Sequence, residues 1–140
     1  MVNLKNENID IAITCIDINE TRYFFEKILG LDLVTEFKVD ESTANNLGLS
    51  PLGFTQTRFV IGSTKIKLLQ FDSADISKAN HHIGINQGVR WISLYVDDIC
   101  QTYKILESEG YEFLGGVPTE PKGILVLKGP EGILIEFIGG

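Results

Sequence analysis

The first segment of the chain alternates between apolar and polar side chains. From Ile9 to Cys15 every second residue is Ile or Cys, which predicts a β-strand over residues 9–16 with one packed face. Asp17 then occupies the position of a helix N-cap, and Glu20 follows three residues later as its capping-box partner. Helical spacing continues to Gly30, a residue type that commonly follows a helix. These patterns predict a strand followed by a helix of about three turns.

The rest of the first half favours strands. Alternating patterns return in three segments, residues 31–39, 53–62 and 64–71. Between the first two, residues 40–53 are polar and then interrupted by Gly and Pro, which predicts a loop or a short lid. Residues 72–88 show no sustained period and predict a linker. The first half is therefore expected to run strand, helix, strand, strand, strand.

The second half repeats this order of elements. An alternating segment over 90–96 precedes Asp98, a second predicted N-cap, and a helical pattern that ends at Gly110. Three shorter strand patterns follow, in residues 111–116, 123–129 and 132–138. A shift of 81 residues carries Asp17 onto Asp98 and the preceding strand onto 90–96. We therefore predict an internal duplication of one βαβββ unit.

Three motifs carry a family resemblance. They are Ile11-x-Ile13-x-x-x-Asp17-Ile18 leading to Leu29-Gly30-Leu31, then Val96-Asp97-Asp98-Ile99, and finally Gly132-Ile133-Leu134-Ile135-Glu136-Phe137. Together they resemble the vicinal oxygen chelate superfamily, the group of glyoxalases, bleomycin resistance proteins and extradiol dioxygenases. The resemblance implies an α+β fold of tandem βαβββ modules, whose mixed sheets curl into a cup with the helices outside. It implies one domain over 1–140, with modules at about 8–71 and 89–138 joined by the linker 72–88.

The resemblance also locates the positions that hold a metal ion in the family, on the first and last strand of each module. Here those four positions are Asp10, Lys67, Trp91 and Glu136, of which Glu136 alone is a residue type the family uses as a ligand. A divalent ion needs several deprotonated oxygen or imidazole donors, whereas indole offers an N–H and Lys67 brings a positive charge. We therefore expect no metal and no cofactor. We expect Lys67 instead to pair with both carboxylates.

Strand parity extends the predicted lining of the cup to alternate neighbours of these positions, including Lys65, Leu134 and Ile138. The residues predicted to contact a ligand are Asp10, Thr14, Lys67, Leu69, Trp91, Ser93, Tyr95 and Glu136. Trp91 and Tyr95 would form a stacking surface beside small hydroxyl groups, as small-molecule pockets commonly do. The alternative is that these aromatic side chains fill a collapsed cup or pack at a subunit interface.

Other candidate residues favour structural roles. Lys67 as a reactive uncharged amine is an alternative, but paired carboxylates would hold it charged. Glu136 is the candidate base for proton transfer, a task that is harder without a metal to acidify the substrate. Adjacent side chains on an extended chain point in opposite directions, so we do not expect His81 and His82 to bind one metal ion together.

Composition narrows the function further. The 140 residues carry 12 basic and 19 acidic side chains, a net charge of -7 that argues against nucleic-acid binding and weakly favours a cationic partner. No apolar tract approaches the roughly 18 residues of a membrane span. Two cysteines, Cys15 and Cys100, are too few for a disulfide framework, so we expect free thiols and a cytoplasmic location.

Together these patterns favour a metal-independent small-molecule-binding protein of the bleomycin-resistance type, which sequesters a small cationic or aromatic ligand in the cup. The first alternative is a lyase, isomerase or epimerase of the glyoxalase superfamily that uses Lys67 and Glu136, with Asp10. The second is an interaction module whose cup is filled by its own side chains. Because each module leaves a sheet edge, we expect a homodimer, with modules paired within one chain or swapped between two.

Overall fold

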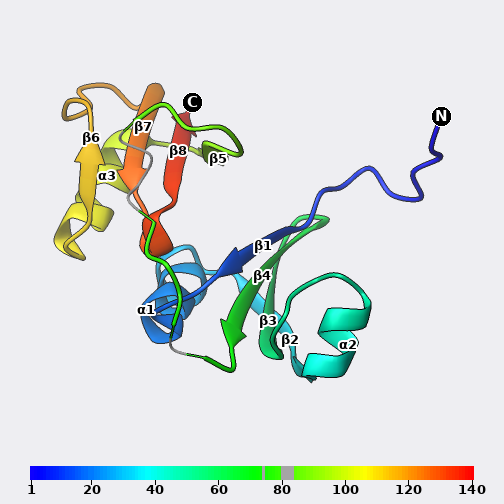
Figure 1. The fold of residues 1–140 in the computed structure, drawn as a ribbon. Coiled ribbons are helices and arrows are strands. Elements are labelled where there is room, and N and C mark those ends of the chain that lie inside the picture. The colour runs from blue at the N-terminus through cyan, green and yellow to red at the C-terminus, as the bar shows by residue number, and fades with distance from the viewer. Residues whose placement is uncertain (74, 80–83) are drawn as a thin grey trace. The chain divides into compact units, whose positions relative to one another are not determined.

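In a computed structural model the chain forms two compact units, Met1–Ser77 and Lys78–Gly140 (Figure 1). The structure describes residues 1–73, 75–79 and 84–140. The boundary between the units falls inside the segment 72–88, which the sequence predicts as a linker. Within the described residues no helix combines the length and the hydropathy needed to cross a bilayer.

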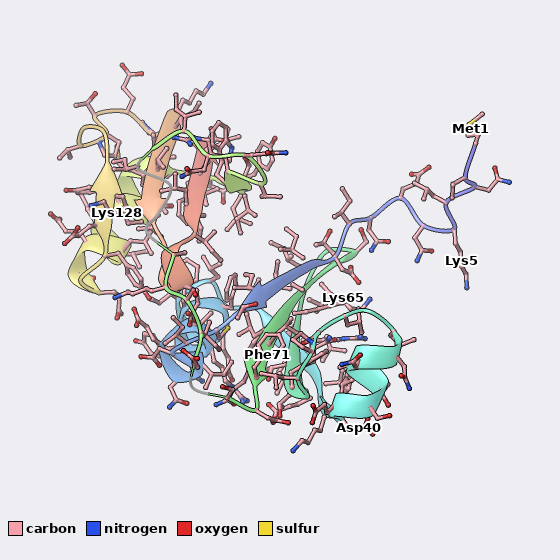
Figure 2. The ribbon with its side chains drawn as sticks, viewed as in Figure 1. Met1, Lys5, Asp40, Lys65, Phe71 and Lys128 are labelled. Carbon is pink, nitrogen blue, oxygen red and sulfur yellow. The ribbon has the colours of Figure 1, made fainter. Side chains whose placement is uncertain are left out.

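The first unit contains a four-stranded mixed sheet. Its elements are β1 (Ile11–Thr14), α1 (Ile18–Tyr23), the π-helical turn η1 (Phe24–Ile28), β2 (Asp32–Val39), α2 (Glu41–Asn46), β3 (Phe54–Ile61) and β4 (Thr64–Phe71). The strand order is β1-β4-β3-β2, with β1 parallel to β4 and the other pairs antiparallel. The side chains of this unit are drawn in Figure 2, where Lys65 is labelled near the start of β4 and Phe71 at its end.

The second unit repeats this topology. Its elements are β5 (Trp91–Val96), α3 (Ile99–Ser108), β6 (Glu112–Leu114), β7 (Gly123–Lys128), the 3-10 turn η2 (Pro130–Gly132) and β8 (Leu134–Gly139). The strand order is β5-β8-β7-β6, and the first strand again lies parallel to the last. The predicted α+β class with a duplicated βαβββ arrangement is therefore confirmed.

The predicted helix caps explain where the long helices begin. The Asp17 carboxylate accepts a hydrogen bond from the Glu20 backbone N–H at 3.0 Å. The Asp98 carboxylate accepts two, from the N–H groups of Cys100 at 2.8 Å and Gln101 at 3.1 Å. Each bond satisfies a backbone donor that the first helical turn leaves without an intrahelical partner. The first helix then ends before Gly30, whose φ of 69° is open to glycine without strain.

Three local predictions needed correction. Residues 41–46 form the helix α2 and not a loop, because Asp40 caps it through the Thr43 N–H at 2.7 Å and Ala44 is fully buried. That hydrogen bond also lowers the pKa of Asp40. The first helix ends in a π-helical turn, in which Leu29 N–H donates to the Phe24 carbonyl at 2.9 Å. The first strand covers Ile11–Thr14 only, and Ile9 and Ile16 at the two ends of the predicted strand are 77% and 54% exposed.

One face of each sheet packs against the helix of its own unit. In the first unit Phe24 and Phe25 are fully buried with Phe59 and Leu68 of the sheet, and the Phe25 and Phe59 rings lie 6.5 Å apart. In the second unit the core gathers α3 and sheet residues that are almost fully buried, Ile99, Leu106, Leu125, Leu127, Ile135 and Phe137. The opposite side of each sheet, which we call its open face, carries the alternate residues of the same strands.

Candidate functional site

The open face of the first sheet carries three of the predicted ligand contacts. In the parallel pair of β1 and β4, Thr14 lies opposite Leu69 and Ala12 lies opposite Lys67. Their sequence neighbours Ile13 and Leu68 are buried on the side of the helix. Because successive side chains on a strand point to opposite faces, Thr14, Lys67 and Leu69 project from the open face.

Asp10 and Lys67 form an ion pair at the edge of this face. Asp10 precedes β1, and its Oδ2 lies 3.4 Å from Lys67 Nζ, with side-chain exposures of 27% and 24%. The other oxygen, Oδ1, accepts hydrogen bonds from the backbone N–H of Lys65 at 3.0 Å and from Asn8 Nδ2 at 3.1 Å. The expected pairing of Lys67 with Asp10 is thus present in the structure.

This arrangement does not fit a divalent metal ion in the first unit. The carboxylate at the mapped position is already engaged by an ammonium group and by two N–H donors. A cation there would have to displace Lys67 and face its charge, and it would find a single oxygen-donor side chain among the mapped positions of this unit. Over the described ranges, the structure contains no cluster of three or more His, Cys, Asp or Glu residues able to hold a metal.

The pKa of Asp10 is lowered from its ordinary value of 3.8, first by the backbone hydrogen bond from Lys65 and then by the side chain of Lys67. A carboxyl group with a lowered pKa stabilises the folded state above its ordinary pKa and loses that contribution as the pH falls through its folded value. We expect Asp10→Asn to be less stable than wild type at pH 7, with the difference shrinking as the pH falls below about 4. Urea unfolding over pH 3–7 measures this difference.

The control for that experiment is Asp32→Asn, which removes an exposed carboxylate from β2. We expect the Asp32 variant to follow the pH dependence of wild type more closely than the Asp10 variant does. A stability difference between Asp10→Asn and wild type that stays constant from pH 7 to pH 3 would contradict the interpretation of the ion pair.

The open face of the second sheet carries the remaining predicted contacts. In the parallel pair of β5 and β8, Ser93 lies opposite Glu136 and Tyr95 lies opposite Ile138. The Ser93 hydroxyl donates a 2.6 Å hydrogen bond to Glu136 Oε1. Trp91 and Tyr95 share this face with Ser93 by strand alternation, and they are 48% and 80% exposed. The second unit therefore presents two exposed aromatic rings beside a carboxylate.

The structure leaves one predicted contact untested and two predicted residues undescribed. Lys67 belongs to the first unit and Glu136 to the second, so their expected contact stays a prediction. His81 and His82 lie outside the described residues. Cys15 is buried and Cys100 is partly buried, and both are free thiols.

The sequence interpretation did not single out Arg58, Gln56 or Phe37. The structure places Arg58 directly opposite Lys67 across the β3–β4 pair, and Gln56 opposite Leu69. Phe37 lies opposite Gln56 on β2, so these three side chains extend the same open face. The alternation within residues 53–62 indicated a strand, but only the pairing register shows which of its side chains accompany Lys67.

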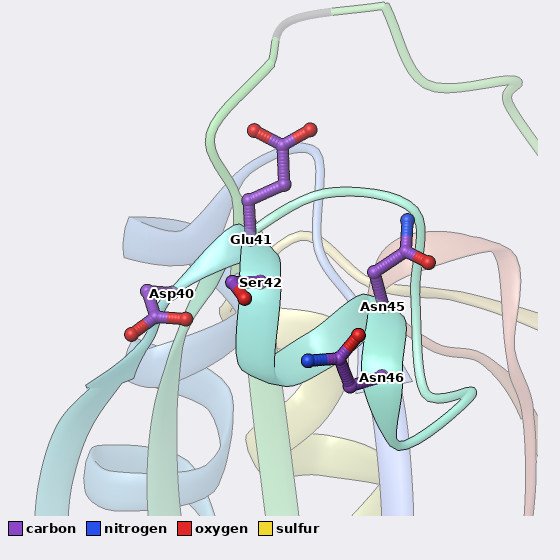
Figure 3. A pocket seen from close by; sticks show the side chains of 5 residues that line it. All are labelled: Asp40, Glu41, Ser42, Asn45 and Asn46. Carbon is purple, nitrogen blue, oxygen red and sulfur yellow. The ribbon is translucent and has the colours of Figure 1, made fainter.

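Two surface hollows lie apart from these residues. The first is a shallow depression on and beside α2, lined by Asp40, Glu41, Ser42, Asn45 and Asn46 (Figure 3). The second lies at the carboxyl ends of β1 and β4 and is lined by Cys15, Ile16, Gln70, Phe71, Ser73 and Ile76. Neither hollow is lined by any of the eight predicted ligand contacts.

The chain is thus an α+β protein built from two βαβββ units. Each unit has a helix-covered face and an open face, and the open faces carry the candidate site residues. The family model described as glyoxalase/bleomycin resistance protein/dioxygenase superfamily matches residues 10–137. The chain therefore belongs to this superfamily, as its motifs indicated. A comparison with curated proteins found no match.

Solved structures share the fold. A glyoxalase family protein from Bacillus cereus is 25% identical with a TM-score of 0.77, and the match covers 100% of this chain and 99% of that one. Glyoxalase I from Leishmania major is 15% identical with a TM-score of 0.68, covering 93% and 84%. The fosfomycin resistance protein FosX from Mesorhizobium loti is 11% identical with a TM-score of 0.63, covering 99% and 94%. At such low identity the last two show similarity of fold alone.

Proposed function

We propose that this chain is a metal-independent small-molecule-binding protein of the bleomycin-resistance type, which sequesters a small cationic or aromatic ligand. The observation that carries the proposal is the open face of the second sheet, where the exposed rings of Trp91 and Tyr95 accompany the carboxylate of Glu136. Aromatic faces attract cations through their quadrupole, and a carboxylate adds a full negative charge. An aromatic ammonium compound satisfies both groups.

Ser93 and Glu136 on this face are oriented by a hydrogen bond between them. Ser93 holds one oxygen of Glu136 through the 2.6 Å hydrogen bond, which leaves the carboxylate capacity for further donors because it accepts through both oxygens. Lys128 on β7 lies opposite Leu134 on this same face, and in the described part of the second unit it pairs with Glu112 at 3.2 Å and not with Glu136. A ligand cation is therefore a suitable partner for Glu136.

The ion pair of the first unit supports independence from metal. Lys67 supplies a positive charge at a position where related proteins place a metal ligand, and it engages Asp10 directly. A permanent ammonium group can neutralise that carboxylate without any ion. The residues proposed to contact a ligand are those predicted from the sequence, namely Asp10, Thr14, Lys67 and Leu69 in the first unit and Trp91, Ser93, Tyr95 and Glu136 in the second.

The proposal includes a homodimer in the cytoplasm. Within the described residues β1 and β5 are edge strands of their sheets, and such edges are open to pairing with another chain. Two free thiols suit a reducing compartment.

The chain offers a direct probe, because Trp91 is its single tryptophan. We expect benzyltrimethylammonium to change the fluorescence of Trp91 saturably and to raise the melting temperature by mass action. Benzyl alcohol has the same ring without the charge, and we expect it to bind at least about tenfold more weakly. Absence of any saturable change with the ammonium compound, together with an unchanged melting temperature, would overturn the proposal and favour the interaction module.

A further inference from the structure

The open face of the first sheet places two positively charged side chains next to each other. Arg58 on β3 and Lys67 on β4 are direct cross-strand partners in the antiparallel pair. The neighbours in the same row are small, with Ala12 beyond Lys67 and Thr35 beyond Arg58. The two cations therefore lie side by side in a row with little side-chain bulk on either flank.

The Arg58 side chain is held in position by two contacts. Its Cζ lies 4.9 Å from the centre of the Phe37 ring, in a cation–π contact. Its Nε donates a hydrogen bond to Oε1 of Gln56, a residue only 9% exposed. Guanidinium carries five N–H donors, and this bond uses one of them. The remaining donors form the planar fork that binds carboxylate and phosphate groups in a bidentate manner.

The charge of Arg58 is not neutralised in the way that other cations of this unit are. Arg22 pairs with Glu26 at 3.4 Å and Glu36 at 3.2 Å, and Lys38 pairs with Asp72 at 3.7 Å. In the described part of the chain, Arg58 has no carboxylate partner within ion-pair distance.

Like charges directly opposite one another on adjacent strands destabilise a sheet. Asp10 compensates Lys67 and not Arg58, so the pair retains a net positive charge on a chain whose overall charge is -7. A bound anion would relieve this repulsion, which adds to the favourable energy of its own hydrogen bonds.

We infer that Arg58 and Lys67 form a subsite for an oxyanion, the carboxylate or phosphate group of a small molecule. The inference deepens the proposed function. It rests on that function only because Lys67 is both one of the proposed ligand contacts and part of this subsite. It assigns a negatively charged ligand group to the open face of the first sheet, whereas the second sheet favours a cationic or aromatic group. Arg58 supplies the bidentate fork and Lys67 supplies a point charge beside it.

The test is a titration of the isotope-labelled full chain with inorganic phosphate and, separately, with acetate, at constant ionic strength in chloride. We expect saturable shifts of the Arg58 Nε–H signal and of the backbone amides beside Arg58 and Lys67. Tighter binding of phosphate would identify a phosphate group as the preferred source of the oxyanion, and tighter binding of acetate would identify a carboxylate. Absence of saturable shifts with both anions would overturn the inference.

Two variants separate a defined subsite from general electrostatic attraction. Arg58→Gln should weaken anion binding at least about tenfold, because a charge-assisted bidentate pair is lost. The matched control Lys38→Gln removes the same charge from the adjacent β2, where alternation places Lys38 on the opposite face from Phe37, and it should leave binding unchanged. Equal weakening by both substitutions would contradict the subsite.

Arg58→Lys keeps the positive charge, and it tests the subsite even if the glutamine variant fails to fold. We expect it to retain the fold, by circular dichroism, and to bind anions at an affinity between those of wild type and Arg58→Gln. Wild-type affinity in Arg58→Lys would contradict a role for the planar fork. Binding of benzyltrimethylammonium, measured on the same variants, should be unchanged, so failure of the anion subsite and failure of the proposed function are distinguishable.

Discussion

Replacing Trp91 with alanine is expected to weaken the binding of benzyltrimethylammonium at least about tenfold, while the free energy of unfolding changes little. The indole is 48% exposed on the open face of the second sheet, so its removal leaves no cavity in the core. The substitution removes the larger of the two rings beside Glu136 and the stronger cation–π partner. Isothermal titration calorimetry measures the affinity, since the variant lacks the fluorescent residue.

The matched control for this variant is Tyr23→Ala. Tyr23 is 46% exposed, close to the exposure of Trp91, but it lies at the end of α1 in the first unit. We expect its loss to leave the affinity for the ammonium compound unchanged. Unchanged affinity in Trp91→Ala, or equal losses in both variants, would count against the open face of the second sheet as the binding surface.

The largest effect on stability is expected from Phe25→Ala. The Phe25 ring is 1% exposed, meets Phe24 edge-on at 5.2 Å between centroids, and stacks with Phe59 at 6.5 Å. Removing a buried phenyl group leaves a cavity and typically costs about 3–5 kcal/mol. That loss is a large fraction of the roughly 5–15 kcal/mol that stabilises a typical domain, so the urea midpoint should fall markedly. Urea unfolding followed by circular dichroism measures it.

The control is Leu33→Ala, which truncates a side chain that is 42% exposed on β2. We expect a cost below about 1 kcal/mol for this variant, because the site is open to solvent and leaves no enclosed cavity. Similar destabilisation by the two substitutions would contradict the interpretation that burial of the Phe25 ring is what makes it important for stability.

Local sequence signals predicted most of the fold. The capping carboxylates Asp17 and Asp98 and the glycines that end the helices act through short-range backbone chemistry, so they are visible in the sequence. Strand alternation likewise separated the buried and open faces, and the repeat of 81 residues indicated two units of one topology. These features depend on neighbours close in the chain.

The helix α2 was missed for a physical reason. It buries a single residue, Ala44, and depends on one cap at Asp40, so its sequence contains no hydrophobic period to reveal it. The π-helical turn at the end of the first helix was missed as well, because a sequence period of about 3.6 does not distinguish it from the preceding α-helix.

The candidate site was predicted in part. Asp10 and Lys67 were expected to pair, and the structure shows the pair at 3.4 Å. The importance of Arg58 could not be inferred in the same way, because its position opposite Lys67 depends on the register between β3 and β4. Register is set by the whole sheet and by the turn at Gly62, and it carries no signal at Arg58 itself.

Independence from metal is tested most directly by one titration of the full chain. Protein dialysed against EDTA is titrated with benzyltrimethylammonium while the fluorescence of Trp91 is followed, and the titration is repeated with Zn²⁺, Ni²⁺ or Mn²⁺ returned in excess. We predict the same dissociation constant in every case, because the proposed contacts of the ammonium compound are the rings of Trp91 and Tyr95 and the carboxylate of Glu136, which attract a cation directly. Saturable binding that appears only after a metal ion is returned would contradict the proposal and favour a metal-dependent enzyme of the superfamily.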